Sequence, residues 1–481
     1  MPSSSGRLRA LLITGLPVFL VSLNLLVMAI AFPALQASFP RSSRAELSWT
    51  LNGHNIVFGT LLIPAGRAAD RWGRRRVFVL GLAIFAAASV VCWLAPGVSW
   101  LVAGRVLQGA GSALVMPASL GLLLAAFPAS QRATAVTIWG AIASLGAALG
   151  PTLGASIVEA AAWRWVFALY VPVAIGAAIV GRFMLSESGE RAGARLPDLG
   201  GLSLFAVALS ALALAIVEGR DWGWSDPRII GAFALAIALL PLFVWRSAMH
   251  PEPVVDLSLF SIRTFSVANL AALVFSVAFF GQVLSGILYL TSVWHYGILA
   301  AALAITPTPA TAALMATPAG QLAVRYGFRT VAVPGALSYS AGVLWVALFA
   351  TPHPAYLTVW LPAALLLGVG IGVSFPILSA ASVSQVPQAR FAVAGAVNQT
   401  ARQIGAVIGV ALAVAILGAS GFHAWFLFSA ATAAVSATVS LLMGSGTASE
   451  PTGALAGTSP AGAAGAPPQG PELDHPPGVR S

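Results

Sequence analysis

Long apolar runs separated by short polar segments extend from about residue 11 to residue 443. The longest stretches without a charged side chain cover residues 264–324, 330–389 and 403–449, which are 61, 60 and 47 residues long. Because a transmembrane helix needs about 20 apolar residues, each stretch accommodates two spans. The runs lack the apolar–polar alternation that marks membrane β-strands. The pattern therefore predicts an all-α polytopic membrane protein.

The same pattern predicts fourteen membrane spans. The first follows Arg7 and Arg9, and it is longer than the roughly 7–15 apolar residues of a cleaved signal peptide, so we expect it to stay in the protein. The spans are expected at residues 11–35, 48–66, 77–95, 100–126, 133–157, 164–185, 199–218, 228–246, 264–290, 298–323, 329–350, 356–384, 391–417 and 421–443.

Composition excludes two other classes of protein. Charged residues make up 8% of the chain, against roughly 25% in soluble proteins. The net charge of +10 would suit a nucleic-acid-binding protein, but the basic residues, all arginine, gather on one side of the predicted spans. We therefore expect the lipid bilayer, and no nucleic acid, as a partner. The single cysteine, Cys92, excludes a disulfide framework.

The arginines also predict the orientation of the chain in the membrane. With a cytoplasmic N-terminus, 17 of the 24 arginines lie in cytoplasmic segments and 5 lie outside. The other two, Arg105 and Arg402, fall within spans. Because arginine is enriched in cytoplasmic segments, both termini are expected in the cytoplasm and the protein in the plasma membrane.

Two related segments indicate a duplicated architecture. PAGRAADRWGRRRV at residues 64–77 and PAGQLAVRYGFRTV at residues 318–331 agree at 8 of 14 positions. The first joins spans 2 and 3 and the second joins spans 10 and 11, which predicts two six-helix bundles with two helices inserted between them. The expected parts are a cytoplasmic N-terminus (1–10), an N-terminal bundle (11–185), a linker with two helices (186–263), a C-terminal bundle (264–443) and a disordered cytoplasmic tail (444–481).

Three motifs carry a family resemblance. They are GRAADRWGRR at residues 66–75, RVLQGAG at residues 105–111, and the spaced residues Gly146, Gly150, Pro151 and Gly154. In this order and in these helices they resemble the major facilitator superfamily, specifically its fourteen-helix drug:proton antiporter branch, over about residues 10–443. The resemblance implies a transporter and not an enzyme, small hydrophobic substrates, protons as the coupled ion, no cofactor and no metal, and function as a monomer.

The first motif is expected to form a gating loop made of Gly66, Asp70, Arg71, Gly73, Arg74 and Arg75. Its two glycines allow a tight turn. Asp70 is the only acid among the surrounding arginines, so it is expected to be paired. The resemblance implies that Asp70 contacts the other bundle at the cytoplasmic face and holds the outward-facing state. A role in topology and solubility alone is the alternative. The second copy has Val324 at this position, so the latch is one-sided.

The glycines of the third motif recur every four residues and so share one helical face, which permits close helix packing. Pro151 removes one backbone hydrogen bond and permits a bend. The resemblance implies an antiporter hinge at Gly146, Gly150, Pro151 and Gly154, on the seam that opens and closes. Ordinary small-residue packing is the alternative.

Buried polar residues predict a proton or substrate pathway. An arginine in a span is expensive and is retained for pairing or function. Arg105 lies near the outer end of span 4, so it either snorkels to the outer interface or, as the resemblance implies, acts with Gln108 in proton transfer or cavity polarity. Arg402 lies mid-span, and it shares a polar helix face, expected to avoid lipid, with Asn398, Gln399 and Gln403.

The main departure from the family lies in the first span. The family commonly has Asp where this chain has Asn24, and no Asp or Glu lies deep in a predicted span. His54 is the one deep side chain that titrates near neutral pH, so it is a candidate proton carrier or else a structural residue. A cavity with Arg105 and Arg402 and no acid favours neutral or anionic substrates over dications. Candidate apolar lining residues are Trp139, Phe275, Phe279, Phe280 and Phe375.

These features predict a secondary active transporter that exports hydrophobic, drug-like molecules by alternating access in exchange for protons. The phosphate-binding pattern GxxxxGK[ST] is missing from the sequence, which argues against an ATP-driven pump. Two alternatives stay open. An uncoupled facilitator or uptake permease of the same fold would suit the loss of the acid at Asn24. A non-transporting membrane sensor or scaffold would suit a chain whose altered polar positions are relics.

Overall fold

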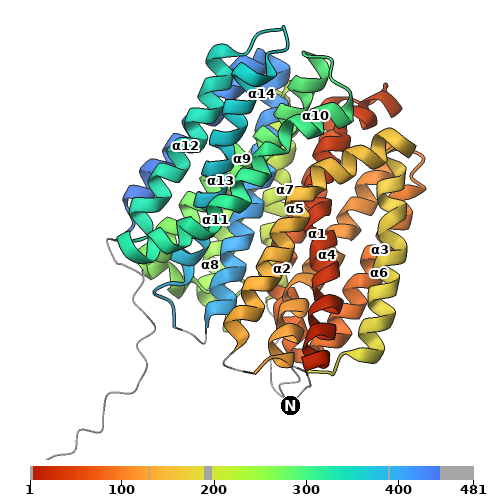
Figure 1. Ribbon diagram of the computed structural model, residues 1–481, viewed down its shortest axis with the longest axis vertical. Helices are drawn as coiled ribbons and strands as arrows, with labels where there is room; N and C mark the ends of the chain where they lie inside the picture. Colours follow the sequence, from red (N-terminus) through yellow and green to blue (C-terminus); the bar gives the residue numbers. More distant parts are fainter. Residues whose placement is uncertain (1–3, 129–130, 189–197, 388–389, 445–481) are drawn as a thin grey trace, which may run out of the picture. The chain divides into compact units, whose positions relative to one another are not determined.

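The computed structural model describes residues 4–128, 131–188, 198–387 and 390–444, and its regular elements are helices (Figure 1). The expected N-terminal segment and the tail lie wholly or partly outside these residues. The helices are α1 (Ser4–Ser38), α2 (Arg44–Trp72), α3 (Arg74–Trp93), α4 (Val98–Ala126), α5 (Arg132–Ala161), α6 (Arg164–Met184), α7 (Leu199–Trp222), α8 (Pro227–Met249), α9 (Arg263–Ser292), α10 (Ile298–Ile305), α11 (Pro307–Tyr326), α12 (Phe328–Phe349), α13 (Leu361–Val383) and α14 (Phe391–Leu441).

The all-α membrane architecture is confirmed. Within the described residues, twelve helical segments are long and apolar enough to cross a membrane. Helices α10 and α11 together form one of them, which includes the predicted span 298–323. The helix is divided where Pro307 begins α11. Helix α14 also counts once, although Gly421 within it has a non-helical backbone (φ 78°). Helix α2, with Asn52, His54 and Asn55 at its centre, is not among the twelve.

The segment expected as a gating loop is mostly helical, which corrects the sequence-based expectation. Helix α2 continues through Gly66 and Asp70 to Trp72. The turn is made by Gly73 alone, whose φ of 100° favours glycine because a side chain there is strained. The N–H of Gly73 donates a hydrogen bond to the carbonyl of Ala69 and so caps the C-terminus of α2. In the second copy, Gly327 (φ 89°) makes the same turn between α11 and α12.

The glycine face of α5 packs against α1. A Cβ atom at Gly146 would lie 2.4 Å from the carbonyl oxygen of Phe19, and one at Gly150 would lie 3.1 Å from that of Leu23. Both contacts are within the first half of the chain. The glycines let α5 approach the α1 backbone, as the alternative of small-residue packing expects, and the antiporter hinge stays a prediction.

The second half repeats this packing. Gly405 and Gly409 of α14 meet the carbonyl oxygens of Leu273 and Val277 of α9, with Cβ distances of 2.4 and 2.3 Å. The α9 residues follow their α1 counterparts by 254 residues, the spacing of the two loop segments, and the α14 glycines follow those of α5 by 259. The duplication read from one loop therefore extends to the contacts between helices.

A second pair of helix contacts repeats with the same spacings. Gly109 of α4 lies against the carbonyl oxygen of His54 in α2, and Gly368 of α13 lies against that of Thr308 in α11, with Cβ distances of 2.6 and 2.5 Å. A glycine at each crossing brings the two backbones together. Each half thus uses the same glycine crossings, although the polar residues beside them differ.

The two halves meet along α2 and α14. Thr400 donates a 3.0 Å hydrogen bond to the carbonyl of Gly59, and a Cβ at Gly59 would lie 2.6 Å from that of Gln403. The inserted helix α7 covers this seam, since its Leu209 and Ala213 pack with residues of both α2 and α14.

On another side, the halves meet at one end. Helix α5 contacts α10 through a 2.9 Å hydrogen bond between Thr152 and Thr306. Near the end of α5, Glu159 accepts a 2.8 Å hydrogen bond from the backbone N–H of Leu299. Figure 1 shows α10 at the end of the molecule opposite to the start of α1. The contacts between α5 and α10 therefore lie far from the Gly73 turn.

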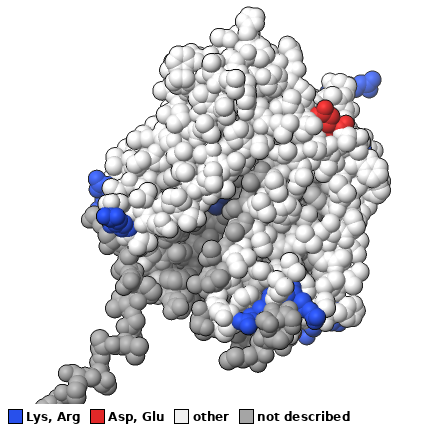
Figure 2. All heavy atoms as spheres, in the orientation of Figure 1, with Lys and Arg blue, Asp and Glu red and all other residues white. Residues whose placement is uncertain are grey.

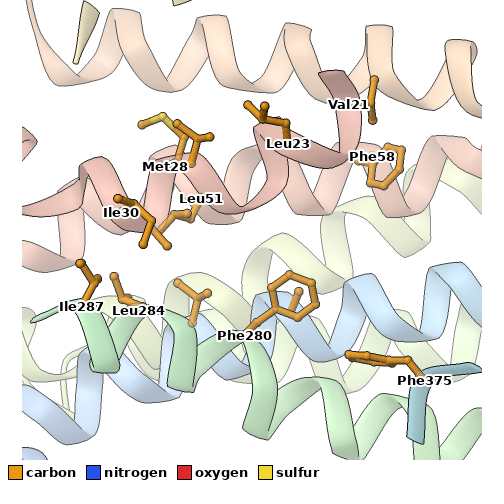
Figure 3. Close-up of a cluster of buried hydrophobic side chains, with 14 of the residues drawn as sticks. Val21, Leu23, Met28, Ile30, Leu51, Phe58, Phe280, Leu284, Ile287 and Phe375 are labelled. Atoms are coloured by element: carbon orange, nitrogen blue, oxygen red, sulfur yellow. The ribbon is translucent and has the colours of Figure 1, made fainter. Parts of the chain in front are cut away.

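An apolar cluster closes the interior beside these hydrogen bonds. In Figure 3, Ile30 of α1 points toward Leu284 and Ile287 of α9. Each of these side chains is buried. By contrast, Figure 2 shows a hollow between the halves on the face that carries α5 and α11, with basic atoms on its wall.

Candidate functional site

Arg105 is the centre of a buried hydrogen-bond network. Its side chain is 1% exposed, so the alternative of snorkelling to the outer interface is wrong. Its Nε donates to the carbonyl of Thr50 at 2.9 Å, and its Nη1 donates to Oδ1 of Asn24 and Oε1 of Gln108, both at 2.7 Å. Gln108 in turn donates to Ser89 at 2.8 Å. The network connects α1, α2, α3 and α4.

Asn24 occupies the position at which the family commonly has an acid, and it keeps the contact with Arg105. Its oxygen accepts the hydrogen bond, while its Nδ2 is buried without a partner. An amide oxygen can accept as a carboxylate does, but it carries no charge and does not titrate. The charge of Arg105 is therefore held by neutral oxygens.

His54 lies fully buried in α2, with both ring nitrogens lacking a hydrogen-bond partner. Its ring stacks on Phe58 at a centroid distance of 6.0 Å. Asn52, two residues earlier, also has an unpartnered Oδ1 and Nδ2. Buried polar atoms in proteins are normally hydrogen-bonded, to protein or to water. The unpartnered atoms of His54 and Asn52 are therefore available to bind water, and the ring of His54 is available to bind a proton.

The turn between α2 and α3 is held by ion pairs. Asp70 accepts hydrogen bonds from Nη2 and Nε of Arg74 at 2.8 and 3.0 Å. Arg74 also donates from Nη1 to the carbonyl of Gly121, at the end of α4, at 3.2 Å. Asp70 and Arg74 thus tie the turn to a helix of the same half, while Arg71 lies one residue before the end of α2.

Glu187 is a partner in this region that the sequence analysis missed. Its carboxylate accepts hydrogen bonds from the backbone N–H groups of Arg75 and Arg76 at 2.9 and 3.3 Å, at the start of α3. A carboxylate at a helix N-terminus is stabilised by the partial positive charge there. The signal in the sequence was an acid directly after span 6, on the same side as the arginines.

Arg402 differs from Arg105 in its surroundings. Its Cζ lies 4.0 Å from the ring centre of Phe375, the geometry of a cation–π contact. The side chain is half-buried, and its Nε is buried without a hydrogen-bond partner. In the described part of the chain, no carboxylate lies within ion-pair distance of this guanidinium.

The other polar residues of α14 divide between two neighbours. Asn398 donates to Oδ1 of Asn269 in α9 at 3.2 Å and accepts from Ser379 in α13 at 3.0 Å. Gln403 is buried toward α2, with an unpartnered Oε1. Gln399 is half-buried. The structure therefore places Asn398 and Gln403 between helices and leaves Gln399 and Arg402 partly accessible.

Four of the five expected lining aromatics form one cluster beside Arg402. Phe375 contacts Phe275 and Phe279 edge to face at centroid distances of 5.0 and 5.2 Å, and Phe279 contacts Phe280 at 4.9 Å. Trp139 lies elsewhere and donates a hydrogen bond to Ser119 at 3.2 Å, between α5 and α4.

A metal site was not expected from the sequence. The described residues contain no group of three or more His, Cys, Asp or Glu arranged to hold a metal ion.

Comparisons with known proteins agree with this architecture. A family model described as Major Facilitator Superfamily matches residues 16–306 and 270–469. Multidrug resistance protein Stp of Mycobacterium tuberculosis is 32% identical over 415 residues, which cover 86% of this chain and 76% of that protein. The tetracenomycin C resistance and export protein of Streptomyces glaucescens is 30% identical over 416 residues, covering 85% and 76%.

A further relative is the methylenomycin A resistance protein of Streptomyces coelicolor, which is 30% identical over 394 residues. These residues cover 82% of this chain and 82% of that protein. Among solved structures, a POT family transporter in complex with 5-aminolevulinic acid superposes with a TM-score of 0.68 over 90% of this chain and 95% of that chain. At 15% identity this likeness supports the fold alone.

Proposed function

Because the chain belongs to the major facilitator superfamily, and is thus a transporter and not an enzyme, we propose that it exports hydrophobic, drug- or antibiotic-like molecules from the cell. The relatives named for multidrug, tetracenomycin C and methylenomycin A resistance support this direction and substrate class. Neutral or anionic substrates are favoured, since the deep cationic residues Arg105 and Arg402 have no acid beside them.

We propose fourteen spans in this protein, with both termini in the cytoplasm of a plasma-membrane monomer. Helix α2 adds one span to the twelve apolar segments, because its polar centre is buried against other helices. Division of α14 at Gly421 adds another. The resulting halves, 11–185 and 264–443, agree with the repeated glycine crossings, and the linker 186–263 contributes α7 and α8. The excess of arginines in the segments assigned to the cytoplasm supports the orientation.

Alternating access is supported by the uneven contacts between the halves. On the side of α5 they join near α10, through Thr152 and Thr306, while the hydrogen bonds described for Asp70 and for the side chain of its partner Arg74 stay within the first half. With the proposed orientation, this is an inward-facing state. In the outward-facing state the contacts at α10 would break, and Asp70 would contact the second half at the cytoplasmic side.

Proton exchange would use His54. Within the described spans, the acids nearest to the interior are Glu159 and Glu218, near the ends of α5 and α7. The two free ring nitrogens of His54 let it accept and release a proton if water reaches it. Arg105, Asn24 and Gln108 would set the electrostatic potential of that path without titrating.

The observation that carries the proposal is the paired architecture, closed near α10 and hollowed between α5 and α11. Accumulation of tetracenomycin C or methylenomycin A in everted vesicles tests it, with and without an imposed acid-inside gradient. Accumulation driven by the gradient supports antiport. Equilibration indifferent to the gradient would make the protein a facilitator, and no movement of either compound would favour a sensor or scaffold.

A further inference from the structure

The two deep arginines of this protein are electrostatically unequal. Arg105 is enclosed, and its Nε and Nη1 bond to Thr50, Asn24 and Gln108. Arg402 is partly accessible, and the contact that the structure gives its guanidinium is the face of Phe375. Arg105 therefore has two of its three nitrogens bonded within the protein, whereas the described residues offer the guanidinium of Arg402 no hydrogen-bond acceptor.

The contact of Arg402 with Phe375 uses none of the guanidinium N–H donors in a described hydrogen bond. A cation–π contact holds the cation over the face of the aromatic ring. The five N–H bonds of arginine lie in the guanidinium plane and point outward from its edge. Phe375 therefore lies beside the cation, and the N–H groups of Arg402 have the geometry to bind a planar anion through two parallel hydrogen bonds.

An unpaired guanidinium in a membrane protein interior is expensive, and such groups normally have a partner. The described part of the chain offers Arg402 no carboxylate within ion-pair distance. Arg402 can neither be neutralised by deprotonation, because arginine stays charged in proteins, nor reach the membrane surface easily from the twelfth position of α14. An anion from outside the chain would supply the missing partner.

The surroundings of Arg402 specify what else this anion must carry. Phe279 is half-buried and lies at a right angle to Phe375, with ring centres 5.2 Å apart, and Phe275 lies at a right angle to Phe375 at 5.0 Å. Aromatic rings favour such edge-to-face contacts with further rings. Gln399, three residues before Arg402, adds a partly accessible amide. A ligand that fits combines an anionic group with an aromatic or flat apolar body.

We propose that Arg402 binds the anionic group of an aromatic substrate, a carboxylate or an enolate, while Phe279 and Phe375 contact its ring system. This inference rests on the proposed export function and narrows its substrate class. The proposal gives the two halves different roles. The second half binds the substrate through Arg402, and the first half contains Arg105 and His54, which do not contact the substrate.

Binding measurements test this assignment without relying on transport. The full chain, in nanodiscs of phosphatidylcholine alone, is titrated with radiolabelled 1-naphthoate and with 1-naphthamide, its neutral analogue, by scintillation proximity. Because the hydrogen bonds between a guanidinium and a carboxylate are charge-assisted, Arg402→Gln should weaken naphthoate binding about 10- to 100-fold. Naphthamide binding should change little. Arg402→Lys, which keeps the charge but loses the two-pronged geometry, should lie in between.

Arg325 provides the matched control. It also lies over an aromatic ring, that of Tyr326 at 5.2 Å, but in the last turn of α11. Arg325→Gln removes the same charge and should leave naphthoate binding unchanged. Thermal unfolding of each variant checks that the fold is retained, and the lysine variant serves if the glutamine variant does not fold.

Several outcomes would overturn the assignment. Equal loss of naphthoate and naphthamide binding in Arg402→Gln would make Arg402 a packing residue for Phe375. Unchanged naphthoate binding in that variant would exclude it as the anion site. Phosphatidylglycerol is added as a competitor for naphthoate. If it displaces naphthoate from the wild type but not from Arg402→Gln, Arg402 would be assigned to lipid headgroups. If the wild type binds naphthamide but not naphthoate, the subsite fails while export of neutral compounds stands, and binding of neither probe would contradict both proposals.

Discussion

Nη1 of Arg105 lies 2.7 Å from Oδ1 of Asn24, so an uncharged amide holds the buried arginine in the first half of the protein. Elsewhere in the family an acid is common at this position of the first span. The contact between α1 and α4 therefore survives here without a group that titrates. This separates two roles that one carboxylate would combine, the anchoring of Arg105 and the carriage of a proton.

Asn24→Asp should restore the second role. A carboxylate at this site would pair with Arg105 and could exchange a proton as the cavity opens, so accumulation in everted vesicles should depend more steeply on the imposed pH gradient. Because the acceptor of the hydrogen bond from Arg105 becomes charged, the protein should be more stable by about 1 kcal/mol. Initial rates at several gradients, beside thermal unfolding, measure both effects, and an unaltered gradient dependence would contradict this view of Asn24.

His54→Ala should abolish the response to the gradient while substrate binding persists. The variant also loses the ring contact with Phe58, so a destabilisation of about 0.5–1.5 kcal/mol is expected. His54→Gln is the control, since it is polar and of similar size but does not titrate near neutral pH. Gradient-driven uptake that survives in both variants would move the proton site away from α2.

Gly146→Ala should destabilise the protein by about 1–3 kcal/mol, the usual cost of overpacking. Its Cβ would lie 2.4 Å from the carbonyl oxygen of Phe19 and would force α5 away from α1. Gly409→Ala should act alike in the second half, where the Cβ would lie 2.3 Å from the carbonyl of Val277. Gly176→Ala in α6 meets no atom within 4 Å and should be neutral or stabilising. Denaturation midpoints compare the three.

Asp70→Asn should reduce transport far more than stability. The carboxylate is 42% exposed and its pair with Arg74 is within one turn of chain, so its loss should cost less than about 1 kcal/mol. The proposed latch of the outward-facing state, however, needs the charge. Vesicle transport and thermal unfolding measured on the same preparation separate the two effects. Transport at the wild-type rate would reduce Asp70 to a topological role.

The pair of Asp198 and Arg246 should make stability depend on acid pH. Asp198, buried before α7, accepts hydrogen bonds from Nε and Nη2 of Arg246 at 2.5 and 2.7 Å. These bonds hold the pKa of Asp198 below its usual value of about 3.8, although burial acts in the opposite direction.

A lowered folded-state pKa means that the stabilisation is complete above the unfolded pKa and is lost as the pH falls through the folded pKa. The melting temperature of the wild type should therefore exceed that of Asp198→Asn by a constant amount from pH 5 to 7, and the difference should shrink below about pH 4. A difference that grows on acidification would have the wrong sign for this pair.

The architecture was largely predictable because it follows from local physics. Apolar runs of sufficient length must be helical in a membrane, since no water satisfies their backbone groups there. The repeat of residues 64–77 at 318–331 predicted the duplication, which the glycine crossings extend to helix packing. The sequence did not reveal that α2 runs to Trp72, because Gly66 suggests a break and tertiary contacts override such weak preferences.

The candidate site was predictable by residue type but not by partner. Charge in an apolar run singled out Arg105 and Arg402, because burying a charge is costly wherever it lies. Partners often come from distant positions on other helices, so the sequence could not tell that Asn24 accepts a hydrogen bond from Arg105 or that Arg402 lies over the ring of Phe375. Nor could it place the Gly146 face against α1 or pair Glu187 with the start of α3. Hydrophobicity and spacing are properties of the chain itself, so the sequence predicted the helical membrane architecture and the repeat. Which polar groups meet was decided by helix packing, because their partners lie on other helices.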